Sequence, residues 1–254
     1  MIRRLLVASG IGIVAFGGLI WAELFMLGRR EYLPTDPGYE IDERIEPAEG
    51  ATGERPLRMA VLGDSTVAGV GSPSEALSLP VLIAKRVADR AGRPVEVVGF
   101  GISGARTATL AERQIPQLDA GFDVIVLVVG SNDATHATFW PELGTQTREM
   151  LERATAFGAP VVLAGTPRFI GTEIIPEPLR TMVDRYSGVL RGEQRAAAEE
   201  SPNVRFVDIA ADASPRFAGV PEATSSDGFH PSAIGYGFWA DAIAPAVVAV
   251  IDKG

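Results

Sequence analysis

The feature that most constrains the fold is an alternation of short apolar runs and longer helical stretches that starts at Leu57. Runs that are apolar throughout are typical of parallel strands covered by helices on both faces. The runs occupy residues 58–62, 95–98, 124–129, 160–164 and 204–207, and the helical stretches occupy residues 76–91, 105–117, 145–157, 177–199 and 232–251. We therefore predict the α/β fold class: a three-layer α/β/α sandwich with about five parallel strands joined by right-handed crossovers.

An apolar segment in residues 1–30 precedes this predicted domain, which spans residues 57–254. Two arginines lie before residues 5–27 and two lie after them, and Glu23 is the only charge between. About 20 apolar residues span a bilayer, whereas the core of a cleaved signal peptide has about 7–15. We therefore expect an uncleaved membrane anchor that leaves the folded domain outside the cytoplasm. Cleavage after Ala22, followed by secretion, is the alternative.

Residues 31–56 differ from both neighbours in composition. They contain eight acidic residues, two arginines and four prolines, with no apolar periodicity. Such a composition cannot bury a core, so we predict an extended, solvated tether.

Composition also limits the chemistry of the protein. The net charge of −9 argues against a nucleic-acid partner, which requires clustered lysine and arginine. The chain has no cysteine and only two histidines, which excludes disulfides and thiolate sites and argues against a metal site with several histidines. Any imidazole chemistry must therefore use His136 or His230.

Polar residues follow several of the predicted strands, at the edge where ligands bind in such folds. The first strand ends in Gly-Asp-Ser at Ser65, the third is followed by Gly-Ser-Asn at Asn132, and a Ser-Ser-Asp-Gly-Phe-His segment ends at His230. The loop after the first strand has no lysine, so it is not a phosphate-binding loop. A Gly-x-Gly-x-x-Gly match at 99–104 lacks the acidic residue that a dinucleotide site needs, so we predict no nucleotide cofactor.

Each of these residues also has a purely structural interpretation. Ser65 could cap the following helix, His230 could be a surface histidine, and Asn132 could be a turn residue. However, Asp227 precedes His230 by three residues and could orient its imidazole as a base. If the strand order is the flavodoxin-like 2-1-3-4-5, Ser65 lies between Gly104 and Asn132, whose N–H groups could then bind an oxyanion.

Four blocks in this order resemble the SGNH (GDSL-type) serine hydrolases over about residues 57–251. The blocks are Gly63-Asp64-Ser65 with Gly69, Ile102-Ser103-Gly104, Gly130-Ser131-Asn132-Asp133 and Asp227-Gly228-Phe229-His230. The resemblance implies the SGNH hydrolase fold, with Ser65 as nucleophile, His230 as general base and Asp227 as its orienting acid. It also implies that Ser65, Gly104 and Asn132 form the oxyanion hole. One difference is Gly99, where the family often has asparagine.

The expected function is therefore hydrolysis of a carboxylic ester through an acyl-enzyme, without a metal or organic cofactor. Two alternatives remain: an acyltransferase or deacetylase acting on a sugar or lipid acyl group, and a catalytically dead, membrane-tethered binding domain. We expect substrate contacts from Arg168 and Phe169 in the 166–175 loop, and from the segment 134–143 with Phe139 and Trp140. His136 is a candidate for the pocket rim. The identity of the ester, whether a small molecule, lipid or glycan, and the oligomeric state stay open.

Overall fold

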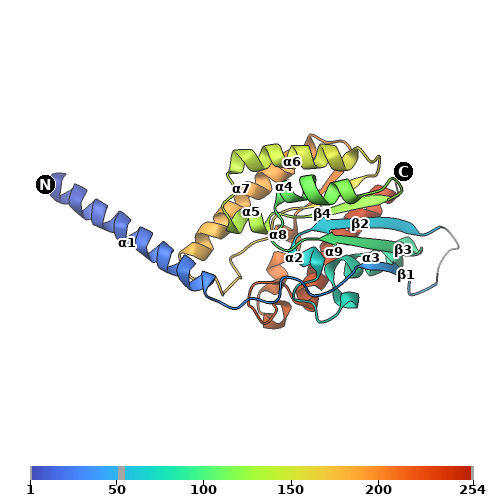
Figure 1. Cartoon of the computed structure of the whole chain (residues 1–254), viewed down its shortest axis with the longest axis horizontal. Helices are drawn as coiled ribbons and strands as arrows, with labels where there is room; N and C mark the ends of the chain where they lie inside the picture. Colours follow the sequence, from blue (N-terminus) through green and yellow to red (C-terminus); the bar gives the residue numbers. More distant parts are fainter. Residues whose placement is uncertain (1, 51–54, 253–254) are drawn as a thin grey trace.

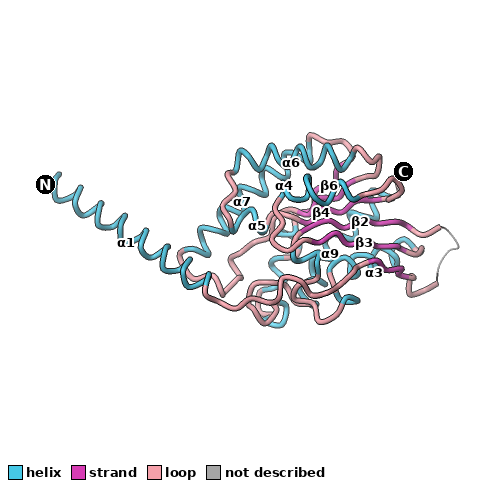
Figure 2. Tube along the Cα trace, in the orientation of Figure 1, coloured by secondary structure: helices cyan, strands magenta, loops and turns pink. Residues whose placement is uncertain are grey.

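A six-stranded sheet lies between two layers of helices (Figures 1 and 2) in the computed structural model, which describes residues 2–50 and 55–252. The strand order is β1-β3-β2-β4-β5-β6. Five strands are parallel: β2 (Leu57–Gly63), β3 (Val95–Gly101), β4 (Val124–Val128), β5 (Val161–Ala164) and β6 (Val204–Val207). The predicted α/β sandwich and its order 2-1-3-4-5 are therefore confirmed for these five strands.

The sixth strand, β1 (Asp42–Ile45), comes from the segment predicted to be a solvated tether. It pairs antiparallel with β3, and the Gly99 N–H donates to the Ile41 carbonyl over 2.8 Å. The prediction is wrong for this stretch because an edge strand needs only backbone hydrogen bonds and a little apolar contact. Here that contact comes from buried Ile41, while the side chains of Asp42, Glu43 and Arg44 are exposed. Residues 51–54 of the predicted tether lie outside the described residues.

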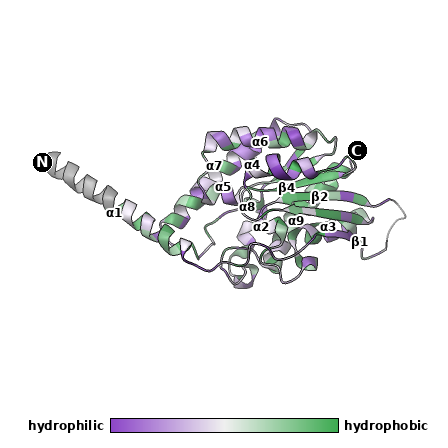
Figure 3. Cartoon of the chain, in the orientation of Figure 1, coloured by the Kyte–Doolittle hydropathy of each residue, from purple (hydrophilic) through white to green (hydrophobic). Residues whose placement is uncertain are grey.

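The two faces of the sheet bury alternate residues of each strand. Met59 and Val61 of β2 pack towards α3 (Leu79–Ala91) and α9 (Ala233–Ile251), whereas Ala60 and Leu62 pack towards α6 (Trp140–Thr155) and α7 (Leu179–Glu199). Figure 3 shows the strands as the hydrophobic centre and the hydrophilic outer surface of α6. The shorter helices are α2 (Ser65–Ala68), η1 (Glu75–Leu77), α4 (Thr107–Thr109), α5 (Ser131–Thr135), α8 (Ile209–Asp212), η4 (Ser214–Phe217) and η5 (Pro221–Ala223).

The stretch predicted as one helix over 105–117 has three parts. After α4 comes a π-helical turn, η2 (Leu110–Gln114), and then a 3-10 turn, η3 (Ile115–Gln117). Pro116 lacks the N–H that a continued α-helix requires. The π turn points Gln114 towards the end of β2, next to the site described below.

The two apolar helices, α9 and α1 (Ile2–Gly28), differ in how much of their surface is buried. The long, apolar α9 satisfies the length and hydropathy of a membrane span, but its Tyr236, Trp239 and Ile243 are buried in the core, as in a helix of a folded domain. Helix α1 (Ile2–Gly28) extends away from the sandwich (Figure 1), and its 15–28 part is a shorter apolar helix. From Phe16 to Met26 it exposes six large apolar side chains to about half or more of their area: Phe16, Leu19, Trp21, Leu24, Phe25 and Met26.

Candidate active site

Ser65 is the first residue of α2, directly beyond the carboxyl end of β2. Asp64 caps this helix, because its carboxylate accepts the N–H of Thr66 over 2.9 Å and the Thr66 hydroxyl over 2.8 Å. The capping role that could have belonged to Ser65 is thus filled by Asp64. The serine hydroxyl is left to project into the cavity at the edge of the sheet.

A buried glutamine holds the strand end that carries this serine. The side chain of Gln114 accepts the Gly63 N–H over 2.9 Å and donates to the Gly63 carbonyl over 2.7 Å. Neither group is exposed to water, so both hydrogen bonds are strongly required. Gln114 therefore positions Gly63, two residues before Ser65.

Asp227 and His230 lie in a tight loop between η5 and α9. The Asp227 Oδ1 accepts the Ser225 hydroxyl and the backbone N–H groups of Phe229 and His230 over 2.8–3.0 Å, and its Oδ2 lies 2.7 Å from His230 Nδ1. Burial by itself raises the pKa of Asp227, but the hydrogen bonds from His230, the two amides and Ser225 outweigh it and lower the pKa to about 2. Asp227 is therefore an ionised carboxylate that accepts a hydrogen bond from the Nδ1–H of His230, which leaves Nε2 without a proton and free to act as a base.

The second imidazole nitrogen completes a chain of contacts. His230 Nε2 lies 3.0 Å from Ser65 Oγ, although the two residues are 165 positions apart in the sequence. The structure thus brings Ser65, His230 and Asp227 together in one hydrogen-bonded line. This arrangement can make the serine hydroxyl nucleophilic.

Three N–H donors belong to the loops that meet at this end of β2: the backbone N–H of Ser65, that of Gly104 after β3, and the side-chain amide of Asn132 after β4. Within the described residues, the backbone N–H groups of Ser65 and Gly104 have no hydrogen-bond acceptor. The Asn132 amide donates to the Ala105 carbonyl over 3.1 Å and contacts Asp64 Oδ2 at 3.4 Å. The 3.4 Å contact exceeds the usual 2.7–3.2 Å for N–H···O, so Asp64 accepts this amide hydrogen only weakly.

Two buried carboxyl groups, those of Asp133 and Asp64, hydrogen-bond to the loops that carry these donors. Asp133 Oδ2 accepts both the N–H and the hydroxyl of Thr107 over 3.0 Å, which ties the loop after β3 to the loop after β4. Burial raises the pKa of Asp133 and of Asp64, in spite of the hydrogen bonds that each accepts.

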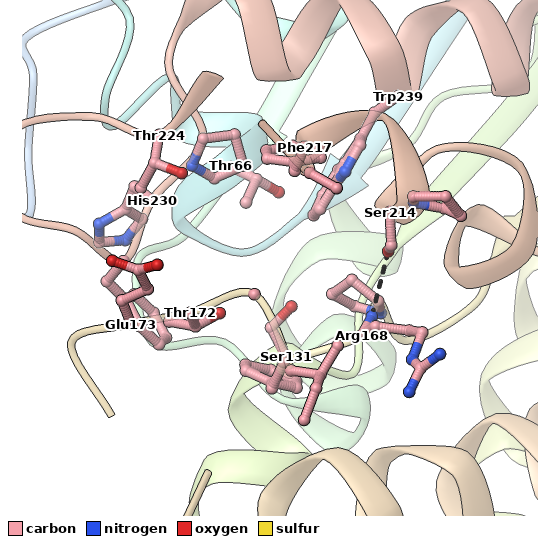
Figure 4. Close-up of a pocket in the computed structure, with 18 of the residues that line it drawn as sticks. Thr66, Ser131, Arg168, Thr172, Glu173, Ser214, Phe217, Thr224, His230 and Trp239 are labelled. Atoms are coloured by element: carbon pink, nitrogen blue, oxygen red, sulfur yellow. Dashed lines mark hydrogen bonds between the residues drawn. The ribbon is translucent and has the colours of Figure 1, made fainter. Parts of the chain in front are cut away.

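A cavity of about 350 Å³ opens beside the serine. Figure 4 shows the side chains around it, which come mainly from the 167–173 loop, η4 with the residues after it, and the His230 loop. Its apolar walls include Phe169, Ile170, Phe217, Phe229 and Trp239, and its polar lining includes Thr66, Ser131, Thr172, Glu173, Ser214 and Thr224.

The predicted substrate contacts divide into two groups. Arg168 and Phe169 line the cavity, but the guanidinium of Arg168 pairs with Asp184 at 2.8 Å, and its backbone N–H donates to Ser214 (Figure 4). His136 is not among the lining residues, and its Nδ1 lies 2.9 Å from the Asn132 carbonyl. Phe139 and Trp140 also lie outside the cavity and are 63% and 46% exposed, because α6 begins at Trp140 and turns them to the surface.

Several residues that support the site were not predicted from the sequence. The backbone N–H of Leu33 contacts Asp227 Oδ2 at 3.4 Å, and Tyr32 packs edge-on against Phe229, with ring centres 6.2 Å apart. Gln194 accepts the Thr166 N–H over 2.8 Å and donates to the Val129 carbonyl over 3.0 Å, which ties the ends of β4 and β5 together. The sequence did not indicate Gln194, because polar residues in helices are usually exposed. Tyr32 and Leu33 lie in the segment that was predicted to be solvated.

The described residues are 2–50 and 55–252. In that part of the chain, no group of three or more histidine, aspartate or glutamate side chains is arranged to hold a metal ion.

Comparisons with known proteins agree with this geometry. A GDSL-like esterase of Mycobacterium tuberculosis is 29% identical over 192 residues, which cover 73% of this chain and about 60% of the length of that relative. Among solved structures, TesA is 24% identical, with a TM-score of 0.62 over 76% of this chain and 99% of its own. An acetyl xylan esterase from Geobacillus stearothermophilus is also 24% identical, with a TM-score of 0.56 over 79% of this chain and 95% of its own.

A family 3 carbohydrate esterase from Clostridium thermocellum is 19% identical, with a TM-score of 0.59 over 78% of this chain and 98% of its own. At these identities the solved structures show the shared fold. The model of the GDSL-like lipase/acylhydrolase family matches residues 61–238, a range that runs from β2 to the middle of α9 and contains Ser65, Asn132, Asp227 and His230. The chain therefore belongs to the GDSL-like lipase/acylhydrolase family.

Proposed function

We propose that this protein is a serine esterase that hydrolyses carboxylic esters through an acyl-enzyme on Ser65. The observation that carries the proposal is the line from Asp227 through His230 to Ser65, with contacts of 2.7 Å and 3.0 Å. Membership of a lipase/acylhydrolase family and likeness to named esterases support it. No step of the reaction calls for a metal or an organic cofactor.

In the first half of the reaction, Ser65 Oγ attacks the ester carbonyl while His230 Nε2 takes the hydroxyl proton. The tetrahedral intermediate collapses when the bond to the alcohol oxygen breaks, and His230 gives its proton to that oxygen. In the second half, His230 takes a proton from water, the hydroxide attacks the acyl carbonyl, and Ser65 recovers its proton as the acid leaves. Asp227 remains ionised and stabilises the imidazolium in both halves.

The negative charge that develops on the carbonyl oxygen needs preformed donors. We assign this role to the N–H groups of Ser65 and Gly104, which have no acceptor within the described residues, and to the Asn132 amide. Gly104 has a φ of +78°, a left-handed conformation that suits glycine.

The cavity limits the substrate that we propose. Its volume of about 350 Å³ lies at the lower end of the range of about 300–1,000 Å³ for small-molecule pockets. Aromatic walls with hydroxyl groups between them suit an ester with a short acyl chain on a small-molecule, lipid or glycan alcohol. The relatives named above include a carbohydrate esterase and an acetyl xylan esterase.

We further propose that α1 anchors the protein in a membrane, with the catalytic domain outside the cytoplasm. The support is the apolar surface that α1 exposes between Phe16 and Met26. Arginines at both ends, Arg3 and Arg4 before the segment and Arg29 and Arg30 after it, suit the two headgroup layers.

The test compares Ser65→Ala with Ser201→Ala, a matched change in the loop before β6. We expect Ser65→Ala to lose nearly all hydrolysis of p-nitrophenyl acetate and all labelling by a fluorophosphonate, while Ser201→Ala keeps both. Asn132→Ala should lower kcat by about 10²–10³-fold, because one oxyanion donor is lost. Full turnover by Ser65→Ala would refute the acyl-enzyme.

A further inference from the structure

Helix α1 is attached to the domain along one side of its last two turns. Ile20 and Leu27 pack against a buried cluster that includes Phe169, Ile175 and Leu179. Between them, Glu23 is only 2% exposed, and its carboxylate accepts the Leu179 N–H over 3.1 Å. A carboxylate at this position satisfies a free N–H at the start of the long helix α7 and complements its dipole. The domain is therefore fixed to α1 between residues 20 and 27.

The other sides of the same stretch of α1 are apolar and open. Leu19, Trp21, Leu24, Phe25 and Met26 are each 47–67% exposed. Helix α1 has 27 residues, a length of about 40 Å, whereas the hydrocarbon core of a bilayer is about 30 Å thick. Because Arg3 and Arg4 lie in the far headgroup layer, the hydrocarbon core takes about 20 residues, from Leu5 to Leu24, and the last four residues, about 6 Å of helix, remain for the headgroup layer at the domain end.

The parts of the domain that touch these residues must lie at the same depth. They are the 169–175 loop and the first turns of α7, which expose Ile170 to 46% and Met182 to 44%. Tyr186 of α7 donates to the Thr138 carbonyl, so Phe139 and Trp140 at the start of α6 lie beside this surface. The same loop forms a wall of the active-site cavity, through Phe169 and Ile170.

We propose that the surface made by Phe139, Trp140, Ile170 and Met182, which we term the apolar rim, rests on the lipid bilayer. The inference depends on the proposed anchoring of α1. It places one wall of the catalytic cavity in the headgroup layer, so that an ester dissolved in the membrane reaches Ser65 without crossing bulk water. Aromatic side chains such as Trp140 are common at this depth.

Because the chain contains no cysteine, the orientation can be measured with single labels. Ile170→Cys and Met182→Cys, each carrying an environment-sensitive fluorophore, are compared with Ala120→Cys and Asn203→Cys. These two control positions are exposed and lie at the opposite edge of the sheet, before β4 and β6. The full chain is reconstituted in phosphatidylcholine vesicles that contain nitroxide lipids, and each labelled variant must unfold at the temperature of the unlabelled protein.

We expect nitroxides near the headgroup to quench the labels at 170 and 182 at least twofold more than those at 120 and 203. Equal quenching at all four positions would overturn the proposal, as would a signal at 170 or 182 that responds only to protein concentration, which would indicate a second copy. A label at Phe16→Cys, read against nitroxides carried midway along the acyl chains, reports insertion separately: without quenching there, α1 is not inserted, and both the anchoring and the orientation are refuted. Hydrolysis of soluble p-nitrophenyl acetate is measured in parallel, so failure of the esterase function is seen independently of orientation.

Discussion

Gly101, the last residue of β3, lies directly against the helix that carries Ser65. A Cβ at this position would lie 2.1 Å from the Ala68 nitrogen, 2.5 Å from the Ala68 Cα and 2.6 Å from the Val67 carbonyl carbon. The φ of Gly101 is outside the left-handed region, so alanine is compatible with the backbone and only the clash opposes it. Because all three atoms belong to the backbone of α2, a change of side-chain rotamer cannot relieve it.

In Gly101→Ala, β3 and α2 must therefore separate by about 1 Å to restore van der Waals contact. Ser65 moves with α2, whereas His230 is held by its own loop, so the Oγ–Nε2 distance grows from 3.0 Å to a value too long for a hydrogen bond. A misplacement of about 1 Å can lower the rate about 10²-fold, and overpacking of this kind costs about 1–3 kcal/mol of stability. We expect kcat/KM for p-nitrophenyl acetate to fall about 10²-fold and Tm to fall by about 3–10 °C.

The matched control is Gly192→Ala, on the exposed side of α7, where a Cβ would meet nothing within 4 Å. This variant should keep full activity and gain up to about 1 kcal/mol, since alanine favours the helix. The reasoning is refuted if Gly101→Ala retains the kcat/KM and Tm of the parent protein.

Two further predictions concern buried polar groups. Gln114→Leu leaves the Gly63 N–H buried without an acceptor and should cost about 1–3 kcal/mol in the free energy of unfolding, measured by urea denaturation, whereas Gln117→Leu on the exposed end of η3 should cost almost nothing. Asp227 has a pKa of about 2 when folded, below its value of about 3.9 when unfolded, so its stabilisation of about 2 kcal/mol is fully present above pH 5 and is lost as the pH falls towards 2. Asp227→Asn should abolish that part of the pH dependence in thermal unfolding and lower kcat by about 10³–10⁴-fold. An unchanged kcat in Asp227→Asn, or an unchanged urea midpoint in Gln114→Leu, would contradict these assignments.

Much of the sheet could be predicted because its strands are buried on both faces and therefore read as continuous apolar runs. The strand order then predicted that the loops carrying Ser65, Gly104 and Asn132 lie next to one another. The pairing of Asp227 with His230 could be predicted because the two residues are close in the sequence. No comparable signal marks β1, because none of its own residues is fully buried and the paired backbone groups leave no trace in the side-chain pattern.

Some residues expected near the cavity do not line it, and the reason is their orientation rather than their residue type. His136 follows Asn132 by one helical turn, but α5 turns its ring onto the Asn132 carbonyl rather than into the cavity. Phe139 and Trp140 are large and apolar, as a pocket wall should be, yet the early start of α6 turns them outward. Gln114 reaches Gly63 only because the chain forms a π turn there, and no local propensity of the sequence indicated that turn.

The antiparallel strand β1 has a consequence for solubility. Without it, β3 would be the outer strand of the sheet and would present a row of free N–H and C=O groups to other chains, as edge strands do in aggregation. The new edge formed by β1 is only four residues long and carries Asp42, Glu43 and Arg44. It therefore offers few backbone groups and several charged side chains to a strand of another chain. A truncated chain beginning at Leu57 would lose this protection, and we expect it to self-associate at concentrations at which a chain beginning at Glu31, which also lacks α1 but keeps β1, stays dispersed.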